Sequence, residues 1–284
     1  MGKRVLTLSN YARMYAHYTY KLALRGSRRL GRLPFQDGRT SCQKMYGLGY
    51  DGFILHCPGP QRLHPNPFRR HWAKACRNFF KDKTLCGRFT DPANLTIITY
   101  NTRPEEELLE RCLRHLGLKE FVVLGRELKA WNWLSKISLV YDYLESGACN
   151  TDYIVCLDGD DVLIVSDPNL ILKRFHEAKC KVLFCNTRGN QPPSQECWDF
   201  ENSVAMEHDL YHRHLNAGGY VGRRAYVHEC LKEILDHAHL ESPWCISPFG
   251  FDDQLAWRHL HRRYYPDIKV DVRCNLFVRF DEDR

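Results

Sequence analysis

The sequence predicts an α/β fold in which a mostly parallel sheet carries helices on both faces. Between residues 95 and 185, short apolar runs rich in β-branched residues alternate with segments of helical periodicity. Alternation at this spacing is typical of βαβ units, which build parallel sheets. One apolar run, 153–157, ends in a cluster of carboxylates, and the ligands of α/β sheets bind at the carboxyl ends of strands. The sequence therefore also indicates where a site would lie.

The first strand is predicted at 95–100, a run of leucine, threonine, isoleucine and tyrosine. A helix is expected to follow from Thr102, because Glu105 three residues on completes a capping box and Pro104 falls in the first turn. This helix is expected to stop at Gly117. Its apolar face is formed by Leu108, Leu109, Cys112, Leu113 and Leu116.

The same alternation continues towards the middle of the chain. Further strands are predicted at 121–124, 153–157, 162–165 and 182–185. A second helix is expected to end near Gly147, and a shorter one lies around 170–176. The core-facing positions of the second helix are Leu134, Ile137, Val140, Tyr141 and Leu144.

Asp158, Asp160 and Asp161 place three carboxylates within four residues at the end of a predicted strand. These carboxylates would repel one another unless a positive group lay among them, and a divalent cation with oxygen ligands is the natural partner. Such a cation often neutralises a diphosphate. The alternative interpretation is a solvated acidic turn. The strand, the Asp-x-Asp and the apolar run after it resemble the metal site of nucleotide-sugar-dependent glycosyltransferases with the GT-A fold.

Two further motifs follow Asp158 and Asp161 in order. Residues 214–222 read His-Leu-Asn-Ala-Gly-Gly-Tyr-Val-Gly, and residues 251–255 read Phe-Asp-Asp-Gln-Leu. This order resembles the glycosyltransferase domain of procollagen lysyl hydroxylases and the related procollagen galactosyltransferases. That family has a strand ending in Asp-x-x-Asp, a Leu-Asn-Ser-Gly-Gly-Phe-Ile-Gly-like stretch, and an acidic run leading into Asp-Gln-Leu. The resemblance covers about 95–280 and implies a GT-A domain that uses a UDP-sugar.

The details of the resemblance include one match and two departures. Cys197-Trp198 falls where some members carry Cys-Trp, whereas Asp160 stands where the family often has an aromatic residue. The family also places a further metal ligand, a histidine in a His-x-Asn-Gly-Pro-like segment, after the last strand. The sequence 280–284 reads Phe-Asp-Glu-Asp-Arg and does not contain it. The third ligand is therefore expected from elsewhere, or from a removed segment, or metal binding is weaker.

By the resemblance, the turn after the first strand meets the base and ribose of the nucleotide. The family's Val-Ile-Thr-Val-Ala-Thr matches residues 97–102. Tyr100 would then stack on uracil, and Thr99 or Asn101 would bond to its polar edge. Thr102 is the last of the nucleotide contacts predicted in this turn. An aromatic cap on the sheet is the alternative role for Tyr100.

Other residues are expected near the diphosphate and the sugar. Lys136 lies early in a helix, where the family carries a lysine, and would place its charge beside the diphosphate. The alternative interpretation is that Lys136 lies on a solvated helix face and contacts no ligand. Gly218-Gly219 removes side chains where backbone approaches a ligand and, with Asn216, would line the donor sugar, although a plain turn also fits. The remaining predicted donor contacts lie in the metal motif, at Asp158, Gly159 and Asp160.

Asp252 and Asp253 are the candidate catalytic carboxylates. In an inverting reaction one of them takes the proton of the acceptor hydroxyl. In a retaining reaction a carboxylate stabilises the oxocarbenium-like centre instead. Either aspartate also suits the N-cap of a helix over 254–261, and the two roles are compatible.

Charge divides the chain into two predicted parts, a basic N-terminal region at 1–91 and the glycosyltransferase domain at 92–284. Residues 1–91 hold 18 Lys or Arg against four acidic residues, a formal charge of +14. The whole chain is +7, so residues 92–284 carry −7. The opposite charges predict that the first part packs on the second. An anionic acceptor, a membrane surface or a nucleic acid is the alternative partner of the basic region.

Cysteine content and hydropathy give little information about the cellular compartment of the protein. The 13 cysteines match no paired zinc signature, so disulfides or buried thiols are expected, with Cys156 and Cys185 in the core. No run approaches a membrane span, and no secretory signal follows Met1. The location stays unknown from sequence. Because the resembled family works in a secretory lumen, a lumenal site stays open if a leader has been removed.

The sequence as a whole predicts a metal-dependent glycosyltransferase that moves a hexose or pentose from a UDP-sugar to a hydroxyl of a protein or glycan. The expected cofactor is Mn²⁺ or Mg²⁺. Two alternatives stay open: a glycosyltransferase acting on a nucleic acid or phosphorylated polymer, and a degenerate GT-A module that binds a nucleotide or glycan without turnover. The sequence names neither the sugar nor the stereochemical outcome.

Overall fold

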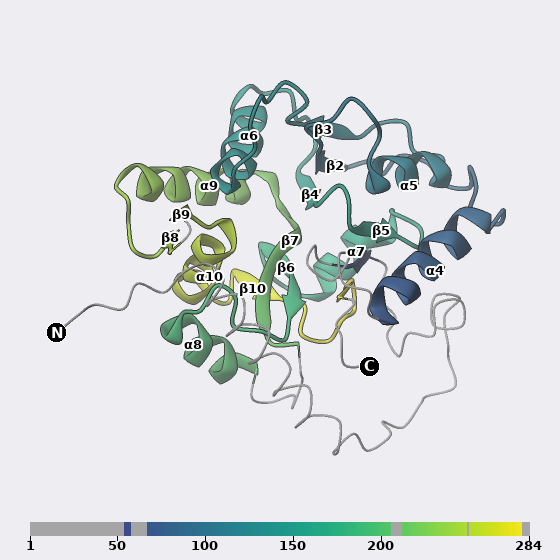
Figure 1. The fold of residues 1–284 in the computed structure, drawn as a ribbon. Coiled ribbons are helices and arrows are strands. Elements are labelled where there is room, and N and C mark those ends of the chain that lie inside the picture. The colour runs from purple at the N-terminus through teal and green to yellow at the C-terminus, as the bar shows by residue number, and fades with distance from the viewer. Residues whose placement is uncertain (1–53, 58–66, 206–211, 249, 280–284) are drawn as a thin grey trace, which may run out of the picture. The chain divides into compact units, whose positions relative to one another are not determined.

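The computed structural model describes residues 54–57, 67–205, 212–248 and 250–279, all within the compact unit 39–280 (Figure 1). A six-stranded sheet has the order β10-β6-β7-β4-β2-β3. β7 is antiparallel to both neighbours, and the other neighbouring pairs are parallel. The predicted mostly parallel α/β fold is confirmed. The strand bounds are β2 Leu95–Tyr100, β3 Val122–Leu124, β4 Tyr153–Leu157, β6 Val182–Thr187, β7 His214–Arg223 and β10 Ile268–Val270.

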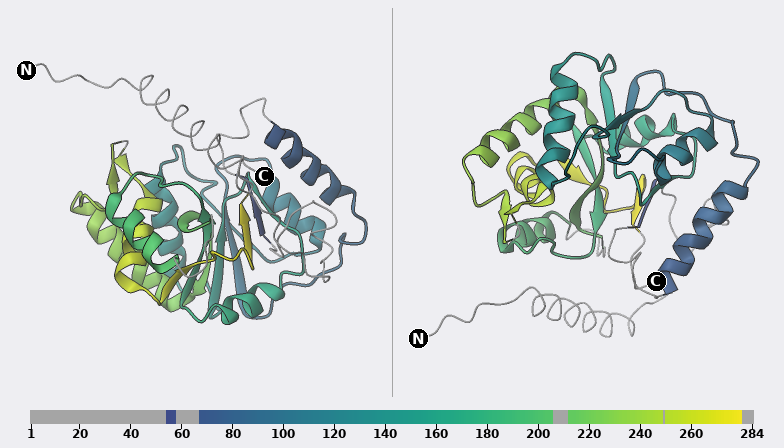
Figure 2. Two further views of the ribbon diagram at one scale, coloured as in Figure 1. Left: turned by 90° about the horizontal axis from the view of Figure 1, so that it is seen from below. Right: turned by 45° about the horizontal axis from the view of Figure 1, so that its top comes forward.

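Helices cover both faces of this sheet, as Figures 1 and 2 show. Side chains alternate along each strand, so Ile97 packs into one core cluster and Ile98 into the other. The Ile97 cluster contains side chains of α4 (Pro67–Lys81), α5 (Leu108–Leu116) and α7 (Leu170–Glu177). The Ile98 cluster contains side chains of α6 (Trp133–Glu145), α9 (Arg224–His239) and α10 (Asp253–Tyr264). The core predicted for α6 is correct at Ile137, Val140 and Leu144.

The start of α5 differs from the prediction. The helix begins at Leu108, and the capping box uses Glu107, whose N–H donates to Glu110 Oε1 at 3.2 Å, instead of Thr102 and Glu105. The reason is Asn101: its Oδ1 accepts from Arg103 N at 2.7 Å, and its Nδ2 donates to Glu105 O at 2.7 Å. These local bonds hold the segment after β2 in a turn that competes with helix formation.

A second sheet has three strands, and its central strand, β1, comes from the N-terminal third of the chain. Its order is β11-β1-β5, with bounds β1 Ile54–His56, β5 Val162–Ile164 and β11 Phe277–Arg279. β1 is parallel to β11 and antiparallel to β5, and all three of its residues are buried. Because most of 1–91 lies outside the described residues, the predicted boundary at 91 and the packing of that whole region stay predictions.

β7, with Gly218-Gly219, lies inside the central sheet between β6 and β4, so this motif is in a strand and not in a turn. α8 (Gln195–Ala205) packs on α10, and β8 (Ile246–Ser247) pairs with β9 (Gly250–Phe251).

The twelve cysteines within the described residues are free thiols, most of them buried, including Cys156 and Cys185. Among the described helices, none has the length and apolar content needed to span a bilayer.

A buried ion pair ties α8 to α10. Arg258 donates from Nε to Glu201 Oε1 at 3.0 Å and from Nη2 to Oε2 at 2.7 Å, and both side chains are fully buried. His214 Nδ1 lies 2.7 Å from the same Oε2. Burial alone would raise the pKa of Glu201, but the hydrogen bonds from His214 and Arg258 hold it below its usual value.

Glu201→Gln is expected to lower the free energy of unfolding by about 3–5 kcal/mol, because it leaves the Arg258 charge buried without a counterion. Urea denaturation measures this. The matched control is Glu196→Gln, which breaks the exposed pair with Arg262 and should cost at most about 1 kcal/mol. Equal losses in the two variants would contradict the buried-pair interpretation.

Candidate active site

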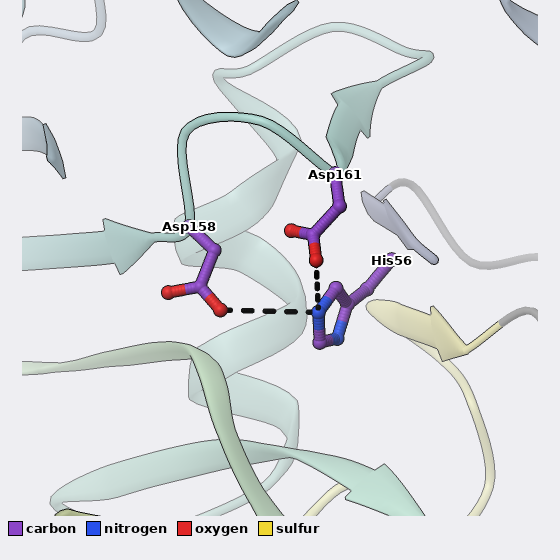
Figure 3. Close-up of side chains that lie close together, drawn as sticks. All are labelled: His56, Asp158 and Asp161. Carbon is purple, nitrogen blue, oxygen red and sulfur yellow. Dashed lines mark ion pairs between the residues drawn. The ribbon is translucent and has the colours of Figure 1, made fainter. Parts of the chain in front are cut away.

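Three potential metal ligands converge at the carboxyl end of β4. They are His56 at the end of β1, Asp158 directly after β4, and Asp161 directly before β5 (Figure 3). One ligand atom from each lies within 4.8 Å of the others. His56 Nε2 is 3.5 Å from Asp161 Oδ2 and 3.9 Å from Asp158 Oδ2. Asp160, predicted as a ligand, is not part of this group.

These separations fit a shared cation. They exceed the 2.7–3.2 Å of ordinary N–H···O hydrogen bonds, so the three groups do not pair tightly with one another. A cation with ligand bonds of roughly 2.1 Å keeps neighbouring ligand atoms about 3 Å apart and opposite ones about 4 Å apart. Two carboxylates with one imidazole favour a transition metal such as Mn²⁺ over Ca²⁺. The described residues therefore fit the predicted divalent metal.

The backbone holds the three ligands in register. Cys57 N donates to Asp161 O at 2.8 Å, which ties the end of β1 to the loop 158–161, called here the metal loop. Asp158 N donates to Gly218 O at 3.0 Å, which ties the same loop to β7. The second ring nitrogen of His56, Nδ1, lies 3.9 Å from the buried Cys185 Sγ on β6. Contacts of this kind orient a metal-binding imidazole.

Gly218 leaves room for two of the ligands. A Cβ at this position would collide with His56 Cε1 and would lie 2.8 Å from His56 Nε2 and 2.9 Å from Asp158 Oδ2. Gly159 is similarly enclosed, because a Cβ there would meet Tyr100 O and lie 2.5 Å from Glu107 Oε2. The two glycines are thus needed to bring β7, β2 and the metal loop together.

Gly218→Ala is expected to weaken Mn²⁺ binding at least about tenfold, because the added methyl group displaces His56 and Asp158 from their shared position. Calorimetric titration with Mn²⁺ measures the effect. Gly189→Ala is the control, since its Cβ would meet only Gln191 side-chain atoms at 3.4 Å or more. Unchanged Mn²⁺ affinity in Gly218→Ala would show that the ligands can relax around the methyl group.

Lys136 links the metal ligands to the candidate catalytic carboxylate. Its Nζ donates to Asp158 Oδ1 at 2.7 Å and to Ala217 O at 2.9 Å, and lies 3.4 Å from Asp253 Oδ2. Burial alone would lower the pKa of Lys136, but the carboxylates of Asp158 and Asp253 raise it above its ordinary value. The lysine is therefore charged. Lys136 is 5% exposed, and its ammonium is directed at protein groups.

The two predicted catalytic aspartates occupy different positions. Asp252 is the N-cap of α10, and its Oδ1 accepts from Leu255 N at 2.9 Å. Asp253 is the first residue of that helix, is 6% exposed and faces Lys136. Burial raises the pKa of Asp253, and Lys136 opposes the rise. Burial also raises the pKa of Asp158, to about 6, again opposed by Lys136.

The predicted donor contacts divide into buried and accessible ones. Thr99, Tyr100 and Asn101 are buried at the end of β2, whereas Thr102 is exposed. Tyr100 packs edge-on against Trp131, with ring centroids 5.8 Å apart. Trp131 is 37% exposed, so it is the aromatic surface accessible beside this strand end.

The predicted residues on β7 face the N-terminal end of α10. Asn216 Nδ2 donates to Gln254 Oε1 at 2.9 Å, and Ala217 N donates to the same oxygen at 3.1 Å. Asn216 Oδ1 accepts from Gly218 N at 3.1 Å. A Cβ added at Gly219 would lie 3.1 Å from Leu157 Cδ2 and 3.2 Å from Phe277 Cε1. The structure thus brings Asn216, Gly218, Lys136, Asp158 and Asp253 close together at one strand end.

His56 is the residue that the sequence analysis did not assign to the site. It lies 102 positions before Asp158, and its approach depends on the pairing of β1 with β5 and β11. The available signal was local: His56-Cys57-Pro58-Gly59-Pro60 has the His-x-x-Gly-Pro pattern of the ligand segment expected after the last strand. This segment precedes the central sheet instead. The third candidate ligand therefore lies elsewhere in the chain, at His56.

Two comparisons with known proteins bear on the family of the chain. A model of the family described as "PLOD GT domain" matches residues 109–282. Human procollagen-lysine,2-oxoglutarate 5-dioxygenase 2 is 25% identical over 150 residues, which are 50% of this chain and 18% of that protein. The chain thus matches less than a fifth of the length of this relative.

Proposed function

The chain belongs to the PLOD GT domain family, and from this membership and its site we propose that it is a metal-dependent glycosyltransferase using a UDP-sugar. The observation that carries the proposal is the convergence of His56, Asp158 and Asp161 at the carboxyl end of β4, with Lys136 and Asp253 beside them. The acceptor in this proposal is a hydroxyl group of a glycan or protein.

His56, Asp158 and Asp161 would hold the divalent metal, with Mn²⁺ preferred. When bound, the metal neutralises the donor diphosphate and the charge that develops on the departing nucleotide. Of the three side chains, Asp158 is the most accessible, at 28% exposed against 3% for His56 and 6% for Asp161. The donor therefore approaches from the Asp158 side, where Trp131 offers a face for the nucleobase.

Lys136 acts in this proposal as an internal counterion. Its contacts with Asp158 and Asp253 keep two neighbouring carboxylates charged inside a buried region. This role replaces the direct diphosphate contact expected from sequence, because the ammonium is directed at protein oxygens. Asp253, at the other end of the bridge, faces the position of the sugar and takes the acceptor proton or stabilises the anomeric centre.

The testing experiment is incubation of the full chain with a panel of UDP-sugars, Mn²⁺ and hydroxyl acceptors, with UDP release as the readout. UDP release above the acceptor-free baseline, lost on addition of EDTA, is expected for at least one donor. Tight UDP binding without release from any donor would instead favour the degenerate binding module.

A second candidate acceptor follows from the +14 charge of residues 1–91. If that region holds a nucleic acid or a phosphorylated polymer, acceptor affinity should fall steeply with salt, because bound counterions are released on association. A neutral acceptor would show little salt dependence. Titration of the same acceptor at two salt concentrations distinguishes the cases.

A further inference from the structure

A separate hollow lies along α10, away from the metal ligands. It has a volume of about 390 Å³ and is lined by Trp244, His259, Leu260, Arg262 and Arg263. This volume is in the range of small-molecule sites. None of these residues takes part in the metal group or in the Lys136 bridge.

The helix connects this hollow with the candidate catalytic end. Asp252, Leu255, His259 and Arg262 follow one another at helical spacings of three and four, which places them on one face of α10. Leu255 and His259 also line a second, smaller hollow of about 160 Å³. A rise of 1.5 Å per residue puts Arg262 about 15 Å from Asp252.

The chemistry of the hollow is amphipathic and balanced in charge. Arg262 Nη1 is 2.6 Å from Glu196 Oε2, and Arg263 Nη1 is 2.7 Å from Glu233 Oε1. The guanidinium groups are therefore already paired, which disfavours a phosphate or another anion. Burial lowers the pKa of His259, so its neutral ring offers one donor and one acceptor.

Trp244 supplies the apolar wall. Its ring packs against His237, with centroids 4.0 Å apart, and against His259, with centroids 5.8 Å apart, so its orientation is fixed. A ligand that suits these walls needs one flat apolar face and a rim of groups that both donate and accept hydrogen bonds. A pyranose ring has both: C–H groups on one face and hydroxyls around the edge.

We propose that the hollow at Trp244 binds a neutral hexose unit of the acceptor, with the rest of the acceptor extending along α10 towards Asp252. The acceptor part of this inference rests on the proposed glycosyltransferase function. Because the two ends are about 15 Å apart, a single sugar ring cannot reach both, and the acceptor is an oligosaccharide or carries one.

The test is binding of the full chain to an array of neutral oligosaccharides of one to six hexoses, with and without Mn²⁺ and UDP. At least one glycan of two or more hexoses should be retained. Trp244→Ala should weaken retention at least tenfold and Arg262→Gln several-fold. Leu240→Ala is the control, since this 76% exposed side chain lies four residues before Trp244 and should leave retention unchanged.

Several outcomes overturn the inference: no neutral glycan retained, retention of extended peptides only, or parental retention by Trp244→Ala. If Trp244→Ala does not fold, Arg262→Gln decides, because its side chain is 48% exposed, and unchanged retention by it overturns the inference. Calorimetry with UDP and Mn²⁺ on the same protein separates the two proposals. Glycan retention without UDP binding would contradict the proposed function but would still support sugar binding in the hollow at Trp244.

Discussion

His56→Ala is expected to abolish Mn²⁺-dependent UDP binding and to lower transfer at least about a hundredfold. The variant removes the only nitrogen donor of the three converging ligands and leaves two like-charged carboxylates, Asp158 and Asp161, to hold the cation. Loss of a group that merely orients a ligand commonly costs 10- to 100-fold in metal affinity, so loss of a direct ligand should cost more.

The measurement is thermal stabilisation by Mn²⁺ and UDP, together with UDP release. Asp161→Ala should show the same loss, because it removes a ligand from the same group. His228→Ala is the matched control, since His228 pairs with Glu145 at the surface of α9. If His56→Ala is stabilised by Mn²⁺ as strongly as the parent, β1 contributes only packing and the third ligand must be sought elsewhere.

Part of the site was predictable because its signals are local. The apolar strand ending at Leu157 and the aspartates that follow it are contiguous, so the sequence alone placed Asp158 and Asp161 at a strand end. The Gly-Gly and Asp-Gln-Leu motifs were expected to lie at the same site, and in the structure they lie in β7, which pairs with β4, and at the start of α10, which contacts β7.

The remainder depends on contacts that no local pattern encodes. His56 reaches the aspartates only because β1 inserts between β5 and β11, a pairing of segments more than 100 residues apart. The bridge from Lys136 to Asp253 joins the first turns of two helices that are distant in sequence. The error at Thr102 has the opposite origin. A valid capping pattern was present, but the side chain of Asn101 formed a competing turn.

Asp253→Asn is expected to lower transfer by roughly a hundredfold or more while UDP and Mn²⁺ binding stays near the parental value. The structure separates Asp253 from helix capping, because the N-cap is Asp252. Burial raises the pKa of the Asp253 carboxyl, which makes it a stronger base than an exposed aspartate. The amide has the same shape but cannot take a proton from the acceptor hydroxyl.

Stability should change little in this variant, since Lys136 keeps its contacts with Asp158 Oδ1 and Ala217 O and the new amide oxygen can still accept from it. A loss of about 1 kcal/mol, or a few degrees in Tm, is the upper expectation. Asp252→Asn is the matched control: it keeps the cap and should retain most of the transfer rate. If the two variants exchange behaviours, Asp252 is the base and Asp253 serves only to hold Lys136. If both keep the parental rate, neither carboxylate takes part in proton transfer, and a group of the acceptor itself must take the proton.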